Sequence, residues 1–521
     1  MKETSRRQSM LSTLAVMGGT LGSRILGFVR IALISMFFGA RGEADVLNAV
    51  FTIPNNFRKL LAEGALSSAF IPELSRQIVQ DPSGKKSRRL SRNILGLQFL
   101  ILVPLSLICI FFPQVVLKIF VRFPEPWMTD LAVRLFRWIF HYILLISISA
   151  VLMAVLNSHN SFLIPALSPL LFSISVITSI SIWHDRFGIF SMVIGVLGGG
   201  VAQILWQYPA YRKLGYRLVP HLNFKDESFR RVMRQWLPVL LTSSIFTVNQ
   251  QVAILLATGL SEGSTTALSN AIVFWQLPFG IFSASITTVL FPKMSRQAGN
   301  GNWDKLSATL QDGIHMLAVL LIPSSVLLVL FGPEMISTAL QRGEFRAEDT
   351  VLTAKVLAAY APGMLFVGCY NLFQRSFYSI GNYRYPMWTA LLTVVTDITL
   401  SLLFLYGFGM GVVGLAWANS IAFVTGAVMM ISGALKGVVR LRAGRLALHL
   451  GKVLLSQIPM VLLVLFLKSR IPVESFSLGS SWKNFGFLAV EGILALVLLF
   501  GFYFLMKLDV LTILRRGRTK K

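Results

Sequence analysis

Charge is scarce in this sequence, and negative charge is scarcer still. Only 13% of the 521 residues are charged, 55% are hydrophobic, and 48 Lys and Arg stand against 22 Asp and Glu. A soluble chain of this length carries about a quarter charged residues, so a soluble protein is excluded. We predict an all-α polytopic integral membrane protein.

Cysteine and histidine are also rare. Cys109 and Cys369 each lie inside an apolar run, which excludes a disulfide framework and a cysteine metal site. The six histidines are scattered singly, with no His-x-x-x-His pair and no carboxylate cluster. Acid–base or metal chemistry needs such groups. We therefore predict no catalytic residues, no metal site and no enzyme activity.

Long apolar runs dominate the chain. Runs of roughly 20 residues are long enough to cross a bilayer as helices. They predict about 14 spans, near 11–40, 46–75, 93–120, 132–157, 161–183, 187–210, 232–260, 266–291, 306–331, 349–378, 386–407, 411–435, 448–468 and 484–507. The first run follows MKETSRRQSM without a small-residue cleavage site, so we expect a retained span rather than a signal peptide.

The basic residues behind the net charge of +26 lie in loops and do not form one surface. Lys and Arg collect in every second loop, for example DPSGKKSRRLSR, and in the tail RRGRTKK. By the positive-inside rule these loops and both termini face the cytoplasm. The basic excess is therefore mostly a topology signal, and we predict no nucleic-acid partner.

Two parts of the chain resemble each other at a spacing of about 220 residues. AFIPELSRQ (69–77) is matched by VLFPKMSRQ (289–297), and Pro165 and Pro386 open helices after similar turns. We predict two six-helix lobes, with helices 13 and 14 added at the end. The corresponding domains are 1–215, 216–440, and 441–521 with its basic cytoplasmic tail.

The first span carries two arginines within SRILGFVRIALI. If a helix starts near residue 11, Arg24 lies about 20 Å in, and Arg30 lies about 15 Å from the other end. A snorkelling arginine covers only a fraction of that depth. The arginines therefore face either a hydrated cavity or a structural partner on a neighbouring helix.

The second span, DVLNAVFTIPNNFRKLLAEGALSSAF, continues this polar pattern. Charges at membrane depth usually face a bundle interior or a substrate path, and we expect Pro54 to interrupt the helix. Spans one and two thus predict a cationic cavity for an anion, phosphate in particular. Asp45 and Glu63 would orient the arginines or form a gate pair, although a structural Arg58–Glu63 pair stays open.

Polar groups are fewer elsewhere. We expect Asp397 to be the only carboxylate deep in the C-terminal helices, and Asn249 lies in an amide run of span seven. A buried aspartate near amides is a candidate site for a coupling cation, Na⁺ or H⁺, and a hydrogen-bonded structural aspartate is the alternative. No other cofactor is expected.

The runs SRILGFVR and DVLNAVFTIPNNFRKLLAEGALSSAFIPELS resemble the N-terminal signature of the MurJ (MviN) lipid II flippase family, within the multidrug/oligosaccharidyl-lipid/polysaccharide exporter superfamily. The resemblance implies alternating-access transport of undecaprenyl-diphosphate-linked disaccharide pentapeptide (lipid II) across the bacterial cytoplasmic (inner) membrane, for peptidoglycan and cell-wall synthesis. It also implies membrane lipids and cell-wall synthesis proteins as partners, coupling to the membrane potential or a cation, and a polyprenyl-tail groove at helices 13 and 14. By position it assigns cavity roles to Ser23, Arg24, Arg30, Asp45, Asn55, Arg58 and Glu63.

The sequence departs from the family pattern at two positions. Ile31 stands where the family usually has an acidic residue, and Val273 stands where it tends to have an arginine. A flippase for another polyprenyl-diphosphate-linked glycan of O-antigen or polysaccharide type is therefore an alternative, as is a cation-coupled drug exporter. A membrane-embedded glycosyltransferase or acyltransferase and a non-transporting scaffold are weaker alternatives.

Overall fold

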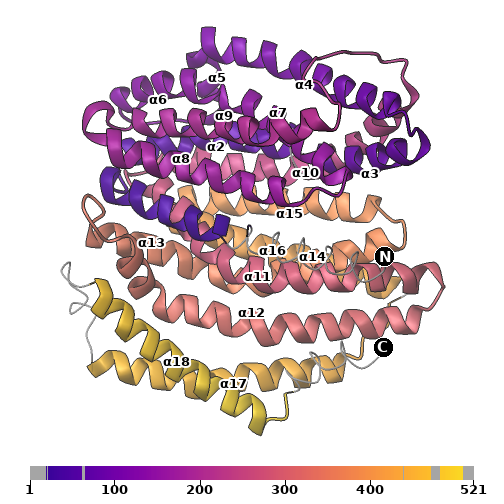
Figure 1. Ribbon diagram of the computed structural model, residues 1–521. Helices are drawn as coiled ribbons and strands as arrows, with labels where there is room; N and C mark the ends of the chain where they lie inside the picture. The colour runs from indigo at the N-terminus through magenta and orange to yellow at the C-terminus, as the bar shows by residue number, and fades with distance from the viewer. Residues whose placement is uncertain (1–18, 20–21, 62–64, 438, 471–480, 509–521) are drawn as a thin grey trace. The chain divides into compact units, whose positions relative to one another are not determined.

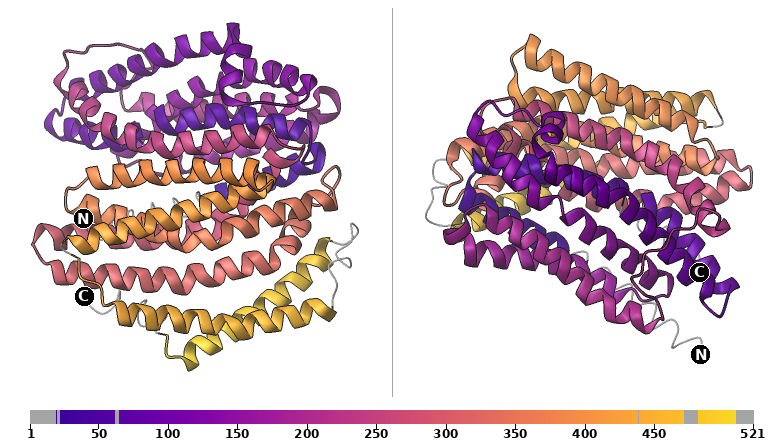
Figure 2. Two further views of the ribbon diagram at one scale, coloured as in Figure 1. Left: turned by 180° about the vertical axis from the view of Figure 1, so that it is seen from behind. Right: turned by 90° about the horizontal axis from the view of Figure 1, so that it is seen from above.

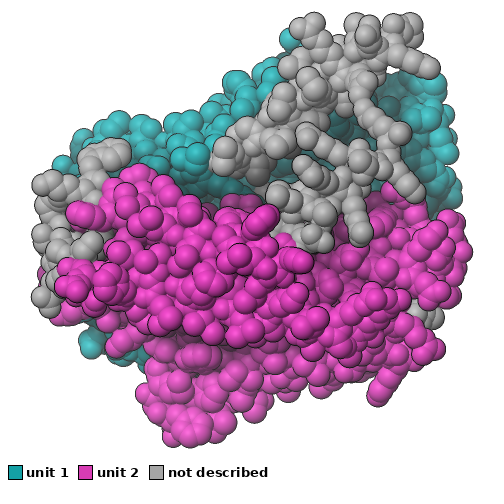
Figure 3. Space-filling model, turned by 90° about the horizontal axis from the view of Figure 1, so that it is seen from below, with its two compact units in different colours: residues 1–262 teal, residues 263–521 magenta. Residues whose placement is uncertain are grey.

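The chain folds into helices, with no strand among the residues that the structure describes. This computed structural model describes residues 19, 22–61, 65–437, 439–470 and 481–508. The helices form two compact units, residues 1–262 and 263–521 (Figure 3). Within each unit the helices lie side by side along a roughly common direction (Figures 1 and 2).

Among the described residues of unit 1, a helix covers residues 22–38. Its further helices are α2 Glu43–Leu61, α3 Ala65–Gln80, α4 Lys85–Phe111, α5 Pro113–Phe120, α6 Pro126–Ile139, α7 Tyr142–Ser158, α8 Leu163–Phe187, α9 Phe190–Lys213 and α10 Glu227–Thr258. The predicted span 93–120 is divided at Phe112, where α4 ends and Pro113 starts α5. Proline suits the first turn of a helix because its missing N–H has no partner there.

Unit 2 contains the second half of the chain. Its helices are α11 Ser264–Gly299, α12 Trp303–Leu340, α13 Ala347–Tyr360, α14 Met364–Ser379, α15 Arg384–Leu402, α16 Gly411–Lys436, α17 Ala443–Arg470 and α18 Ser481–Leu505. A 3₁₀ turn, Ala361–Gly363, joins α13 to α14, and a π-helical turn, Leu403–Gly407, ends α15.

Eleven helices among the described residues are long and apolar enough to cross a membrane. The other three predicted spans correspond to residues 22–38, to α2 with α3, and to α10. These are the segments that carry the polar residues of the first, second and seventh predicted spans. The polytopic all-α class is confirmed, and the count of fourteen spans stays a prediction.

The first compact unit is longer than the first predicted lobe. Unit 1 ends at Glu262, whereas the sequence places a boundary after residue 215. Helix α10 accounts for the difference, because it packs against α2 and α3. Its side-chain amides Gln250 and Gln251 accept hydrogen bonds from Lys59 and Asn56 of α2.

The repeat seen in the sequence recurs in the backbone. After α7, the N–H of Ser161 donates to the carbonyl of Leu156, and Asn160 has a φ of 60°. After α14, the N–H of Asn382 donates to the carbonyl of Phe377, and Gly381 has a φ of 76°. Both are left-handed helix ends of the same kind. The two units therefore share this turn about 220 residues apart.

Helices α8 and α9 pack closely because α9 presents glycines to its neighbour. A β-carbon added to Gly195 would lie 2.7 Å from the α-carbon of Val176 and 3.0 Å from Cβ of Ser179. The Ser175 hydroxyl donates to the Gly195 carbonyl at 2.9 Å across the same contact. Small residues allow this approach where lipid gives no hydrophobic force between helices.

We predict that Gly195→Ala destabilises the protein by about 1–3 kcal/mol, because the backbone of α8 must move to admit the methyl group. Gly451→Ala is the matched control, since a β-carbon there meets nothing within 4 Å. Thermal unfolding of the purified proteins in detergent measures both. Equal midpoints for the two variants would show that the contact tolerates a methyl group.

Candidate functional site

A cavity of about 540 Å³ lies in unit 1, lined by both polar and apolar side chains. Its walls come from five parts of the chain: residues 22–38, α2, α7, α8 and α9. The residues that line it are Ser23, Gly27, Arg30, Phe51, Asn55, Arg58, Tyr142, Ile146, Met153, Pro169, Phe172, Ser173 and Gln203. Ser23, Arg30, Asn55 and Arg58, four residues predicted from the sequence, thus share one cavity.

The first helix presents one face to this cavity. Ser23, Gly27 and Arg30 follow each other at spacings of four and three residues, which places them on the same side of a helix. Arg24 follows Ser23 directly and so lies about 100° away around the helix. It is exposed and does not line the cavity, so its predicted role in binding stays a prediction.

Helix α2 contributes Asn55 and Arg58 from adjacent turns of the same face. Arg58 Nε donates to Asn55 Oδ1 at 3.0 Å, which holds the guanidinium against the wall. The expected interruption at Pro54 does not occur, because α2 runs from Glu43 to Leu61 through that proline. Pro54 is buried, and a single lost hydrogen bond can be tolerated in a packed helix.

Arg30 is the second cationic group in the cavity. Its guanidinium carbon lies 5.3 Å from the centre of the Phe172 ring, within the range of a cation–π contact. Its Nε is buried and makes no hydrogen bond among the described residues. Arg58 lies close enough to repel Arg30 electrostatically. A buried donor without a partner costs free energy, so an anion here would stabilise Arg30.

Tyr142, Phe172 and Gln203 also line the cavity, and our sequence analysis did not assign them to the site. Gln203 Nε2 donates to the carbonyl of Ser168 at 3.2 Å, which links α9 to α8. A β-carbon on Gly200 would lie 2.9 Å from Cβ of Leu145 on α7. The glycine run GVLGGGVA before Gln203 was the available signal, since it allows the close packing that brings these helices around the cavity.

The cavity has a strong charge imbalance. Two guanidinium groups face it, and none of its described lining residues is acidic. Asn55, Ser23, Ser173 and Gln203 add neutral groups that can donate hydrogen bonds. Paired arginines with neutral donors suit a phosphate or diphosphate, because guanidinium binds such anions through two parallel hydrogen bonds.

Of the two predicted gate residues, the structure describes only Asp45. Asp45 is buried in the first turn of α2, where a carboxylate interacts favourably with the helix N-terminus. Arg58 lies thirteen positions further along α2, which corresponds to about 20 Å along a helix. Asp45 does not line the cavity. Glu63 lies outside the described residues. The gate role of both stays a prediction.

The predicted cation site is divided between the two units. Asp397 on α15 is buried and accepts hydrogen bonds from Asn419 Nδ2 at 2.7 Å and from the Ser401 hydroxyl at 3.4 Å. Asn249 is half-buried on α10 in unit 1. Gln251, two residues further along α10, accepts a hydrogen bond from Asn56 and donates one to the carbonyl of Phe120. These bonds give Asp397 and Gln251 structural partners, and the cation role stays a prediction.

Comparison with known proteins places the chain in a family. A family model described as "Lipid II flippase MurJ" matches residues 34–485. The chain belongs to the MurJ family. This confirms the resemblance found in its N-terminal motifs. The matched range includes Asn55 and Arg58 and begins after Ser23 and Arg30.

Two relatives agree with this MurJ assignment. A probable lipid II flippase MurJ of Borreliella burgdorferi is 35% identical over 502 residues, which cover 96% of this chain and 97% of that protein. A probable lipid II flippase MurJ of Buchnera aphidicola is 31% identical over 385 residues, covering 73% of this chain and 75% of the relative.

Two solved structures share the fold of this chain. A lipid II flippase MurJ in an inward closed conformation superimposes with a TM-score of 0.77 at 26% identity, covering 95% of this chain and 99% of that one. An inward-facing MATE family multidrug resistance transporter gives a TM-score of 0.65 at 16% identity, covering 80% of this chain and 94% of the transporter. The MATE match shows a common fold.

Proposed function

We propose that this MurJ family member is a lipid II flippase, which moves undecaprenyl-diphosphate-linked disaccharide pentapeptide from the inner to the outer face of the bacterial cytoplasmic membrane. It acts as a transporter and not as an enzyme. Transport proceeds by alternating access, in which the head-group site opens first to one side of the membrane and then to the other.

The observation that carries this proposal is the arginine cavity of unit 1. Arg30 and Arg58 face it without a carboxylate among the described lining residues, so it suits the diphosphate of the substrate. Its volume of about 540 Å³ is that of a site for a drug-sized ligand. The cavity therefore holds the diphosphate and adjoining sugar, while the rest of the large head group lies outside it.

The transmembrane potential can contribute to the driving force. With both termini in the cytoplasm, as the basic loops predict, transport carries the anionic head group toward a positive exterior. This movement is favoured by about 2.3 kcal/mol per charge per 100 mV. Coupling to Na⁺ or H⁺ remains part of the proposal, as do contacts with membrane lipids and with other cell-wall synthesis proteins.

One observation favours a glycan other than lipid II as an alternative substrate. Val273, where an arginine was expected from the family resemblance, is a half-buried apolar residue on α11. The anion site of unit 1 has no cationic counterpart at that position, and this is compatible with a different polyprenyl-diphosphate-linked glycan. Organic cations are poor candidates, because the cavity itself is cationic.

Complementation in bacteria depleted of their own lipid II flippase tests the proposal. We expect the wild-type chain to restore growth and Arg58→Ala to fail at matched membrane expression. If a well-expressed wild-type chain does not restore growth, lipid II is not its substrate in that host. Cells that require transport of another polyprenyl-linked glycan would then be tested in the same way.

A further inference from the structure

Helices α17 and α18 pack on α12 through an apolar core in unit 2. Each helix contributes buried apolar side chains to this core: Ala318, Val319, Ile322 and Phe331 of α12, Val453, Met460 and Val464 of α17, and Ala495, Leu499 and Tyr503 of α18, together with Leu508 just after α18. Toward one end of this core, Tyr503 Oη donates to the carbonyl of Val319 at 3.0 Å. Toward the other end, the next turn of all three helices carries an ionisable residue.

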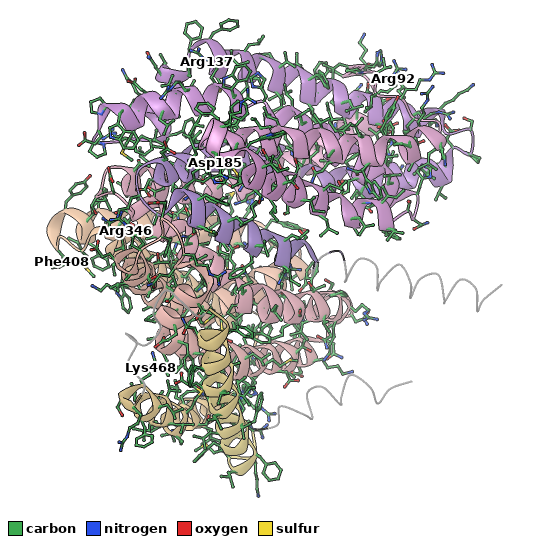
Figure 4. The ribbon with its side chains drawn as sticks, turned by 60° about the vertical axis from the view of Figure 1, so that its left-hand side comes forward. Arg92, Arg137, Asp185, Arg346, Phe408 and Lys468 are labelled. Atoms are coloured by element: carbon green, nitrogen blue, oxygen red, sulfur yellow. The ribbon has the colours of Figure 1, made fainter. Side chains whose placement is uncertain are left out.

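Glu334, Lys468 and Glu491 form this ion cluster, so the expectation that Asp397 is the only buried carboxylate of the C-terminal helices is wrong. Glu334 lies one turn after the core residue Phe331, and Lys468 one turn after Val464. Glu491 lies one turn before Ala495. Lys468 Nζ lies 2.5 Å from Glu334 Oε1, donates to the carbonyl of Leu330, and stands 5.7 Å from the centre of the Phe331 ring. Figure 4 labels Lys468 on α17. The lysine is thus directed toward α12.

With both carboxylates ionised and Lys468 protonated, the cluster has a net charge of −1. Glu334 is 1% exposed, and its Oε2 is buried without a hydrogen-bond partner in the described chain. Glu491 is 5% exposed, makes no hydrogen bond or ion pair with the described residues, and interacts electrostatically with Glu334 and Lys468. Lys468 balances one carboxylate but not both. Two buried carboxylates that share a site do not readily ionise together.

A structural salt bridge alone does not explain this arrangement. The Glu334–Lys468 pair already neutralises itself, and a leucine or methionine at position 491 would continue the apolar core at lower cost. A metal cation is disfavoured because the Lys468 ammonium already lies at Glu334, and no group of three metal-binding side chains occurs in the part of the chain that the structure describes. One added proton makes the cluster neutral.

We propose that Glu334, Lys468 and Glu491 form a proton-binding site between α12, α17 and α18. One proton from water converts the Glu491 carboxylate to a carboxylic acid, which can donate a hydrogen bond to the unpartnered Oε2 of Glu334. The cluster lies near the ends of α12 and α17 that the topology prediction places on the outer side. Proton release restores the second negative charge and weakens the attachment of α17 and α18 to α12.

Thermal unfolding of the purified full-length protein in detergent, measured across pH, tests this site without any substrate. Because the folded cluster holds a proton that the unfolded chain releases, its contribution to stability is lost as pH rises. We expect the wild-type midpoint to fall by roughly 3 °C more than that of Glu491→Gln between pH 6 and pH 8.5. Glu334→Gln should behave like Glu491→Gln, since Lys468 then faces a single carboxylate.

Glu344→Gln is the matched control. Glu344 is exposed in the loop between α12 and α13, so this variant should keep the wild-type pH slope. Infrared difference spectra at pH 7 give an independent readout: the carbonyl band of a protonated carboxylic acid should be present in the wild type and missing in both cluster variants. Unchanged pH slopes together with no lost band in Glu491→Gln and Glu334→Gln would overturn the proposal.

Discussion

Replacement of Arg30 by alanine is expected to abolish rescue of cells depleted of their lipid II flippase. Arg30 faces the cavity over the Phe172 ring, and its Nε has no hydrogen-bond partner in the described chain. A hydrogen bond to a charged group contributes about 1.5–3 kcal/mol, so substrate binding should weaken about tenfold to 150-fold. Plating of the depleted cells at matched membrane expression measures the loss.

Two further variants make this result specific to the cavity. Arg137→Ala removes an exposed arginine of α6, labelled in Figure 4, and should rescue like the wild type. Arg30→Lys keeps the charge but loses the planar fork and much of the contact with the ring, so it should rescue only in part. Full rescue by Arg30→Ala would show that the unit 1 cavity is not where the head group binds.

Insertion of one carboxylate into the cavity should be as damaging as removal of an arginine. Ser23 lies on the same helix face as Arg30, two turns earlier, and long side chains on a helix lean toward its N-terminus. The carboxylate of Ser23→Asp would therefore attract Arg30 and repel a diphosphate. We expect Ser23→Asp to fail in complementation although both arginines remain.

Ser23→Asn is the control for this prediction, because asparagine has nearly the size and shape of aspartate without the charge. It should retain most of the rescue, since an amide can still donate a hydrogen bond to phosphate. If both variants fail equally, side-chain size at position 23 is decisive and the electrostatic account of the cavity is wrong. Membrane levels of the two proteins must be matched.

Much of the fold could be predicted because lipid imposes simple rules on sequence. Apolar runs of sufficient length predicted the helices, including the eleven that are apolar enough to span a membrane. Helix α10 was harder to place, since hydropathy does not tell which unit a helix packs against. Its attachment to unit 1 depends on contacts between side chains, such as that of Asn56 with Gln251.

The candidate site was predicted in part for a similar reason. Arg30, Arg58 and Asn55 stand out as polar groups at membrane depth, whereas Ser23 was assigned from the family resemblance. The cavity brings all four together. Depth alone does not separate Arg24 from Arg30, because that distinction needs the rotation of the helix. Phe172 and Tyr142 could not be found, because aromatic residues in an apolar helix look like ordinary core residues.

Lipid II movement by the purified protein tests the central claim most directly. The protein is reconstituted into liposomes that contain fluorescent lipid II, and a membrane-impermeant reagent then quenches the label from outside. We predict that the wild type exposes the inner-leaflet label to the reagent, while Arg30→Ala and Arg58→Ala leave it protected, as in protein-free liposomes. Protection by the wild type, or equal exposure by the arginine variants, would contradict this account.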